Sequence, residues 1–383
     1  MAPLTLIAAP NAFKGSLTPD RAALAMAEGI NKIHADIKII KIPVSDGGDD
    51  LIPAMAQAMG GQMISTRVND PRQRPIQADF LFNEKKQTAV IEMALASGLA
   101  LLPPALQDPL AATTLGTGEL IRAALDKGAK KIVLGIGGSA TCDGGMGAAM
   151  ALGYQFFDTQ GAILPPVGAS IIKVAKIDRT YLDSRIHSVQ ILTACDVKNP
   201  LTGPMGAARI FGPQKGASKA QVESLDKGLE HLGQIISKDL GIDIFSLKGA
   251  GAAGGLGGGI KAFFNGDLVP GIDLVLDLVE FKQHLKKADL VLTAEGQMDE
   301  QTRFNKAPAG VARQALAQGV PCIALCGGMG DQINELHDLG IDAVFSICNR
   351  PLSLDRAKTN AFELLSRATQ QAVRAFLAGR KSI

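Results

Sequence analysis

The sequence contains no apolar run long enough to cross a membrane. Hydrophobic residues make up 46% of the 383-residue chain, but no run approaches the roughly 18 apolar residues of a membrane span. The N-terminus has no basic leader, so no signal peptide is expected. The five cysteines form no CxxC pair and no even framework, which favours thiols in a reducing compartment over disulfides or a zinc site. We therefore expect a cytoplasmic protein with no membrane partner.

The chain also lacks an excess of charge and several well-known catalytic motifs. Its 39 basic and 37 acidic residues leave a net charge of +2, which argues against a protein built to hold nucleic acid. No Gly-Lys pair occurs anywhere, so an ordinary phosphate-binding P-loop is excluded. Neither a G-x-S-x-G nor an HExxH motif is present, so a serine hydrolase and a catalytic zinc are both disfavoured.

What the chain does contain is short Val- and Ile-rich runs that alternate with helical patterns, which is typical of an α/β protein. Runs between 61 and 92 favour antiparallel strands, whereas those near both ends favour strands alternating with helices. Because single cores stop growing near ~250 to 300 residues, the length predicts two domains. The pattern predicts one α/β domain made from 1–75 and 287–383, with an inserted α/β domain at 76–286.

Individual elements can also be placed. "LTLIAAP" and "IKIIKIPV" are the first predicted strands, the second ending at Val44, and a helix is expected from Thr18, with proline in its first turn. Further helices are expected at about 218–239, 309–318 and 330–339, and from near Leu354.

The stretch "GIGGSATCDGGMGAAMALG" combines seven glycines with an aspartate, Asp143. It follows a predicted strand and satisfies the G-x-G-x-x-A dinucleotide fingerprint from Gly135, so a nicotinamide-dependent dehydrogenase is one alternative. The fingerprint needs the helix to begin at the pyrophosphate, whereas "TCDGG" intervenes here. An aspartate beside phosphates is tolerable if a cation such as Mg²⁺ lies between them.

Acids and glycines also follow other predicted strands. Asp46, Asp196, and Glu295 with Asp299 all stand at strand ends, where α/β sheets bind their ligands. Basic residues occur in similar loops: Lys14, Arg209, Lys215 and Lys306. Carboxylates that hold a metal, together with glycine amides and cations that hold phosphate, are the components of phosphoryl transfer. A second glycine-rich stretch, "GAGAAGGLGGG" at 249–259, indicates either ligand contact or tight packing.

The ordered series "APNAFKGSL", "VSDGGDD", "TTLGTGELI", "GIGGSATCDGGMGAAMALG", "ACDVKNPLTGPMGAARIFGPQKGAS" and "LVLTAEGQMD" resembles the type I glycerate kinases over nearly the whole chain. The resemblance implies ATP- and Mg²⁺-dependent phosphorylation of D-glycerate, generally to 2-phosphoglycerate. It also implies a discontinuous Rossmann-like or flavodoxin-like three-layer domain and an inserted mixed-sheet domain, with the active site in the cleft. The expected oligomeric state is a monomer or a homodimer. A metabolite sensor on the same fold is a second alternative, because Asn11, Ala12 and Asn305 depart from the family pattern.

The expected site follows from these residues. Catalytic roles are expected for Asp196, Lys14 and Asp46, with Asp196 accepting the proton of the substrate hydroxyl. Metal ligation is expected from Asp196, Glu295 and Asp299, and substrate binding from Ser16, Arg209 and Lys306. The nucleotide is expected to contact a larger set: Gly137, Gly138, Ser139, Thr141, Asp143, Gly144 and Lys215.

Overall fold

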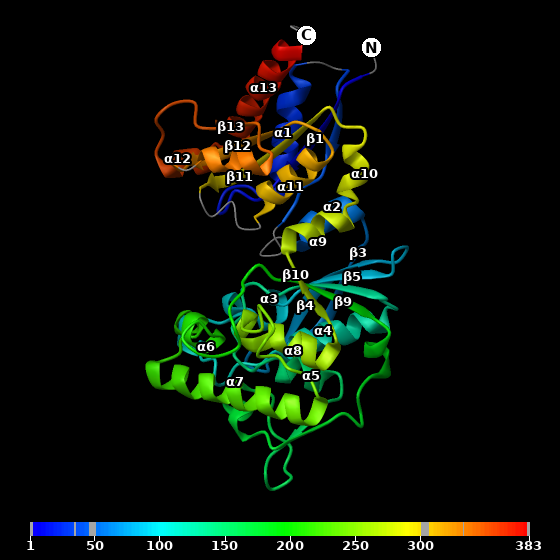
Figure 1. The fold of residues 1–383 in the computed structure, drawn as a ribbon, viewed down its shortest axis with the longest axis vertical. Helices are drawn as coiled ribbons and strands as arrows, with labels where there is room; N and C mark the ends of the chain where they lie inside the picture. The colour runs from blue at the N-terminus through cyan, green and yellow to red at the C-terminus, as the bar shows by residue number, and fades with distance from the viewer. Residues whose placement is uncertain (1–2, 34–35, 46–50, 300–305, 332, 381–383) are drawn as a thin grey trace. The chain divides into compact units, whose positions relative to one another are not determined.

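The computed structural model describes residues 3–33, 36–45, 51–299, 306–331 and 333–380, which form two compact units (Figure 1). The first unit contains 1–46, 53–60 and 270–383, and the second contains 47–52 and 61–269. The predicted domain boundaries near 75 and 287 stay a prediction. The strand at 62–69, which that prediction gave to the first domain, pairs in the sheet of the second unit.

The first unit is built on a five-stranded parallel sheet of order β13-β12-β11-β1-β2. Its strands are β1 (Thr5–Pro10), β2 (Lys38–Lys41), β11 (Leu290–Met298), β12 (Cys322–Met329) and β13 (Ala343–Ser346). Numbered along this unit, the order is 2-1-3-4-5, which is that of flavodoxin-like folds. The direction of winding reverses between β1 and β11, and such a reversal is where open α/β sheets bind ligands.

The helices of this unit are α1 (Pro19–Asn31), α2 (Leu51–Met59), α9 (Gly271–Leu278), α10 (Phe281–Leu285), α11 (Ala307–Ala317), α12 (Leu354–Thr359) and α13 (Ala361–Arg380). Of these, α1, α11 and α13 pack on the strands of the sheet. Leu6 and Ala8 belong to one core with α1 and α13, which lie side by side in Figure 1. Ile7 and Ala9 alternate with them and are also fully buried, on the face that α11 contacts. The unit is therefore the three-layer α/β fold that was predicted.

The second unit holds a six-stranded mixed sheet of order β10-β9-β6-β5-β4-β3. Its strands are β3 (Gln62–Asn69), β4 (Pro75–Asn83), β5 (Thr88–Glu92), β6 (Lys131–Gly135), β9 (Gln190–Ala194) and β10 (Asp267–Val269). A separate two-stranded antiparallel sheet contains β7 (Gln155–Phe157) and β8 (Lys176–Asp178). The pairs β3–β4 and β4–β5 are antiparallel, as predicted, and the rest of the large sheet is parallel.

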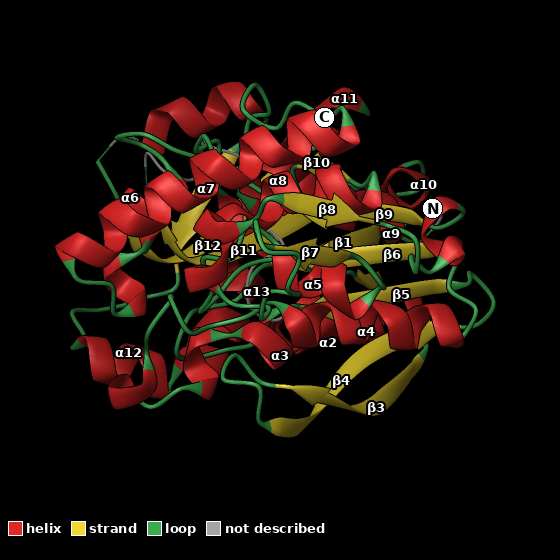
Figure 2. Cartoon of the chain, turned by 90° about the horizontal axis from the view of Figure 1, so that it is seen from below, coloured by secondary structure: helices red, strands yellow, loops and turns green. Residues whose placement is uncertain are grey.

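The helices of this unit contribute buried residues to one large hydrophobic core. Figure 2 shows helices as red ribbons and strands in yellow. The helices of the second unit are α3 (Ala94–Ser97), α4 (Leu115–Asp126), α5 (Met146–Ala151), α6 (Ala207–Phe211), α7 (Lys219–Leu240) and α8 (Leu256–Phe264). The longest, α7, begins with a capping box formed by Ser218 and Gln221 and ends at Gly241, which has a positive φ of 72°. Its bounds agree with the predicted helix at 218–239.

Some predicted elements differ from those observed. β2 ends at Lys41 rather than Val44, although the chain keeps pairing with β1 through hydrogen bonds from Ile42 and Val44. The helix expected at 330–339 is a 3-10 helix, Ile333–Leu339, and the final helix is broken at Asn360 between α12 and α13. No helix among the described residues is long and apolar enough to span a membrane.

Candidate active site

The loop after β1 presents a lysine at its tip because two apolar residues anchor its base. Phe13 and Leu17 are buried and paired, with the Phe13 amide donating to the Leu17 carbonyl at 2.8 Å. Lys14 between them is exposed. Gly296 on β11 allows this loop to come close, since a Cβ there would lie 3.3 Å from the Cα of Phe13. The sequence thus places a cation beside the end of β11.

Glu295 lies on β11 next to this loop and is 9% exposed. Asn11 Nδ2 donates to its Oε1 at 3.4 Å, so the residue that departs from the family pattern contacts a predicted metal ligand. Asp299 follows β11, and its Oδ2 accepts from Gln297 Nε2 at 3.2 Å. Mg²⁺ is commonly held by one or two carboxylates, substrate phosphates and waters, so this donor set fits it. No cluster of three or more acidic, His or Cys side chains that could hold a metal occurs among the described residues.

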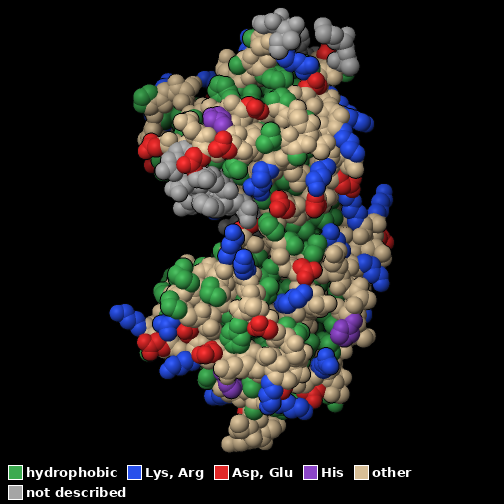
Figure 3. Space-filling view, in the orientation of Figure 1, with side chains coloured by type: hydrophobic (Ala, Val, Ile, Leu, Met, Phe, Trp, Pro, Cys, Tyr) green, Lys and Arg blue, Asp and Glu red, His purple; other side chains and the backbone are tan. Residues whose placement is uncertain are grey.

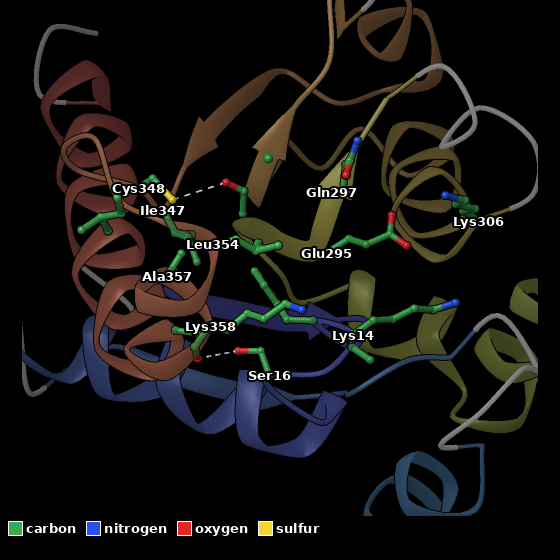
Figure 4. Close-up of a pocket in the computed structure, with 17 residues that line it drawn as sticks. Lys14, Ser16, Glu295, Gln297, Lys306, Ile347, Cys348, Leu354, Ala357 and Lys358 are labelled. Atoms are coloured by element: carbon green, nitrogen blue, oxygen red, sulfur yellow. Dashed lines mark hydrogen bonds between the residues drawn. The ribbon is translucent and has the colours of Figure 1, made fainter. Parts of the chain in front are cut away.

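Glu295 also lines a cavity of about 600 Å³ within the first unit, together with Lys14 of the β1 loop (Figure 4). One end of the cavity holds Lys14, Glu295 and Lys306. Ser16 of the β1 loop also lines the cavity, and its Oγ donates to the Lys358 carbonyl on α12 at 2.9 Å. The structure therefore brings together Lys14, Ser16, Glu295 and Lys306 from the predicted set. Sequence analysis missed Lys358 and the apolar residues of α12, because nothing in an exposed polar segment indicated a cavity wall.

The glycine-rich stretch of the second unit follows β6 as a long loop, and α5 begins only at Met146. Gly137 and Gly138 are exposed in a turn. The Gly138 carbonyl accepts from Leu99, and the Ala140 amide donates to Ser97, so the turn is fixed to the segment that follows β5. A helix that starts eleven residues beyond β6 does not have the dinucleotide-binding geometry, and nothing supports the dehydrogenase alternative.

Asp143 is fully buried within this loop, and its carboxylate accepts four hydrogen bonds. The donors are the backbone amides of Thr114, Gly145 and Gly147 and the hydroxyl of Thr114, at 2.8 to 3.2 Å. Burial raises the pKa of Asp143, and these hydrogen bonds oppose the shift. These hydrogen bonds connect Asp143 to the first residues of α4 and α5. They do not support the predicted contact between Asp143 and the nucleotide.

Lys215 is buried beneath the same loop. Its Nζ donates to Ser139 Oγ and to the Thr141 carbonyl, both at 2.7 Å. Burial lowers the pKa of Lys215 to about 8, and the nearby Cys142 and Asp143 only partly offset this. Because Ser139 Oγ accepts from Lys215, the hydroxyl keeps its own hydrogen to donate to another acceptor. Thr141, in contrast, is fully buried.

The remaining predicted residues are more dispersed. Asp196 is exposed two residues beyond β9, and the register pairs Ala194 with Gly135, so Asp196 follows the strand adjacent to the Gly137 turn. Arg209 forms an ion pair with Asp226 on α7, with Nε 3.0 Å from Oδ2. Asp46 lies outside the described residues. On the face in Figure 3, basic and acidic side chains are interspersed, in keeping with the small net charge.

The second glycine-rich stretch packs against the first. The Gly144 amide donates to the Gly254 carbonyl at 3.1 Å, and a Cβ on Gly254 would lie 2.0 Å from the Thr141 carbonyl oxygen. A Cβ on Gly259 would similarly lie 2.4 Å from the Gly144 oxygen. Of the two alternatives for 249–259, the geometry therefore favours tight packing.

This packing predicts a large effect of Gly254→Ala. Gly254 has a φ of +68°, and an added Cβ collides with backbone, so we expect a loss of about 2 to 4 kcal/mol in the free energy of unfolding. Gly241→Ala is the matched control, because Gly241 has a φ of +72° and no atom near its Cβ position. The control should cost about 1 kcal/mol. Urea unfolding measures both, and equal losses would refute the packing argument.

The buried lysine predicts a pH-dependent stability. In the unfolded chain Lys215 keeps its proton up to about 10.5, whereas in the folded chain it releases it near 8. The unfolded state binds more protons in this window, so this group makes stability rise with pH. Relative to Lys215→Met, the wild type should gain about 1 kcal/mol between pH 7 and pH 9. Urea unfolding of both proteins at the two pH values tests this, and parallel changes would contradict a lowered pKa.

Taken together, the features define an α/β protein with cations and carboxylates at the carboxyl ends of parallel strands, a constellation suited to phosphoryl transfer. A sequence model of the glycerate kinase family matches residues 6–377. The chain belongs to the glycerate kinase family, as the sequence motifs predicted.

Similar proteins cover almost the whole chain. The glycerate kinase of Bacillus subtilis is 42% identical over 367 residues, and the glycerate 2-kinase of Escherichia coli is 40% identical over 367 residues; each alignment covers 96% of both chains. A crystal structure described as glycerate kinase 2 from Salmonella typhimurium has a TM-score of 0.90 and 40% identity, and the match covers 99% of each chain. Nothing in these comparisons supports the alternative of a metabolite sensor.

Proposed function

We propose that this protein transfers the γ-phosphoryl group of ATP to D-glycerate and produces 2-phosphoglycerate. The observation that carries the proposal is the match of nearly the full chain to the glycerate kinase family, including an Escherichia coli relative named glycerate 2-kinase. The cavity with Lys14, Lys306 and Glu295 supports it, because phosphoryl transfer depends mainly on positioning and on neutralising charge.

Within the first unit, the proposed roles follow from chemistry. Lys14 and Lys306 are point charges suited to the oxygens of the transferring phosphoryl group. Glu295 and Asp299 would hold Mg²⁺, which neutralises charge on the phosphates when bound. Asn11 positions the Glu295 carboxylate through its amide. Ser16 was predicted to bind substrate, but its hydrogen bond to Lys358 suits it better to holding the cavity wall together.

Within the second unit, the Gly137–Gly138 turn and Ser139 are proposed to bind the glycerate carboxylate. The amides of these exposed glycines and the Ser139 hydroxyl are donors, and Lys215 donates to that hydroxyl and carries a positive charge beside it. Lys215 is thus a positioning residue for Ser139. Asp196, at the end of the neighbouring strand, is proposed to accept the proton of the substrate hydroxyl. Arg209 is less suited to bind substrate, since Asp226 already holds it.

The proposal is tested by ADP release in the presence of ATP and MgCl₂. We expect release that depends on D-glycerate and saturates with it, and little release with 3-hydroxypropionate, which keeps the carboxylate and the 3-hydroxyl but lacks the 2-hydroxyl that accepts the phosphoryl group. Release that is the same with and without D-glycerate would refute the proposal. The proposal also includes a cytoplasmic location, which cell fractionation tests. It includes a monomeric or homodimeric state, which size-exclusion chromatography tests.

A further inference from the structure

The cavity of the first unit has two ends of different chemistry. One end carries Lys14, Lys306 and Glu295, as Figure 4 shows. The other is formed by Ile347 from the loop after β13 and by Leu354 and Ala357 from α12. Leu354 is 69% exposed, although it is a large apolar side chain on the cavity wall. Covering such a side chain with an apolar ligand surface removes it from water and favours binding.

A three-carbon hydroxy acid does not match this arrangement. Glycerate carries a carboxylate and two hydroxyls and has almost no apolar surface to bury against leucine and isoleucine. A cavity of about 600 Å³ is within the range of sites for much larger ligands. The matching ligand is elongated, with a flat apolar head and several negative charges at its other end.

We propose that this cavity binds the complete nucleoside triphosphate, with the base against Ile347, Leu354 and Ala357 and the phosphates extending to Lys14 and Lys306. The inference deepens the proposed kinase function and rests on it, and it assigns the nucleotide to the first unit. This differs from the sequence-based expectation that the glycine-rich loop after β6 holds the nucleotide.

The fold supports this assignment independently of the charges. The loops after β1 and β11 meet where the winding of the sheet reverses, which is the position at which flavodoxin-like sheets bind nucleotide cofactors. Gly327 and Gly328 at the end of β12 line the same cavity without side chains, so a ligand can approach the backbone there. The Ser16 to Lys358 hydrogen bond joins the β1 loop to α12, so the cationic and apolar walls are held together.

The proposal predicts how affinity depends on the parts of the nucleotide. We would measure binding of adenosine, AMP and ATP by isothermal titration calorimetry. Ala357→Trp fills the apolar end and should weaken all three ligands at least tenfold. Lys14→Met should weaken ATP at least tenfold and change adenosine by less than twofold. Gln371→Trp, on the exposed side of α13, introduces the same side chain outside the cavity lining and should bind all three like the wild type.

A second variant at the apolar end of the cavity keeps the test valid if Ala357→Trp does not fold. Leu354→Ser alters a largely exposed side chain and should weaken adenosine and ATP about threefold or more while the protein stays folded. Wild-type affinity for ATP in both Ala357→Trp and Leu354→Ser would overturn the proposal. Unchanged affinity in Lys14→Met would overturn the placement of the phosphates.

The kinase assay separates this inference from the proposed function. If D-glycerate is phosphorylated and Ala357→Trp keeps a wild-type KM for ATP, the nucleotide site is wrong and the function stands. If ATP binding is lost in Ala357→Trp but the wild type does not phosphorylate D-glycerate, the nucleotide site stands and the function is wrong.

Discussion

Lys14→Met should reduce kcat/KM for ATP by about 10² to 10³, because it removes a cation from the oxygens on which charge accumulates during phosphoryl transfer. Methionine keeps the apolar stem and removes only the ammonium group. Lys14 is exposed at the tip of a loop whose base is anchored by Phe13 and Leu17, so the free energy of unfolding should change by less than about 0.5 kcal/mol. Steady-state kinetics and urea unfolding measure the two quantities.

The control for this variant is Lys286→Met, which removes an exposed lysine of the same unit that does not line the cavity. It should keep wild-type kinetics. If the two variants have the same kcat/KM, Lys14 is an ordinary surface residue, and the proposed charge stabilisation at the end of β1 is incorrect.

Asp196→Asn should lower kcat by about 10² to 10⁴, the usual contribution of a general base. Asparagine preserves shape and hydrogen bonding but cannot accept the proton of the substrate hydroxyl. Since Asp196 is exposed after β9, the fold should be retained, and KM for D-glycerate should change only a few-fold. Initial rates over a range of D-glycerate concentrations give both parameters.

Glu223→Gln makes the same chemical change on the exposed side of α7 and should leave kcat unaltered. A kcat of Asp196→Asn within threefold of the wild type would remove Asp196 as the base. A large rise in KM at constant kcat would instead indicate that the carboxylate binds substrate equally in the ground state and in the transition state.

The elements of the fold were predictable because their signals are local. The alternation of strands with helices near both ends, the antiparallel runs between 61 and 92, and the capping box of α7 are each encoded within a few residues. The break at Asn360 was missed, since helical periodicity continues across it from α12 into α13.

The burial of site residues was not predictable in the same way. Lys215 and Asp143 were expected to face a ligand, but contacts with residues far away in the sequence determine their surroundings. Lys215 donates hydrogen bonds to residues 139 and 141, which are 74 or more positions away in the sequence. Asp143 accepts two hydrogen bonds from Thr114. Arg209 is likewise held by Asp226 from a different helix. Charge patterns in sequence indicate which chemistry is present, while tertiary packing decides which groups remain accessible.

Conversion of the reaction product by enolase tests the central claim most directly. The purified protein is incubated with D-glycerate, ATP and MgCl₂, and enolase is added without phosphoglycerate mutase while phosphoenolpyruvate is followed by absorbance. Transfer to the 2-hydroxyl predicts immediate formation of phosphoenolpyruvate in step with ADP release. ADP release without phosphoenolpyruvate would show transfer to the 3-hydroxyl, and no D-glycerate-dependent ADP release would contradict the account as a whole.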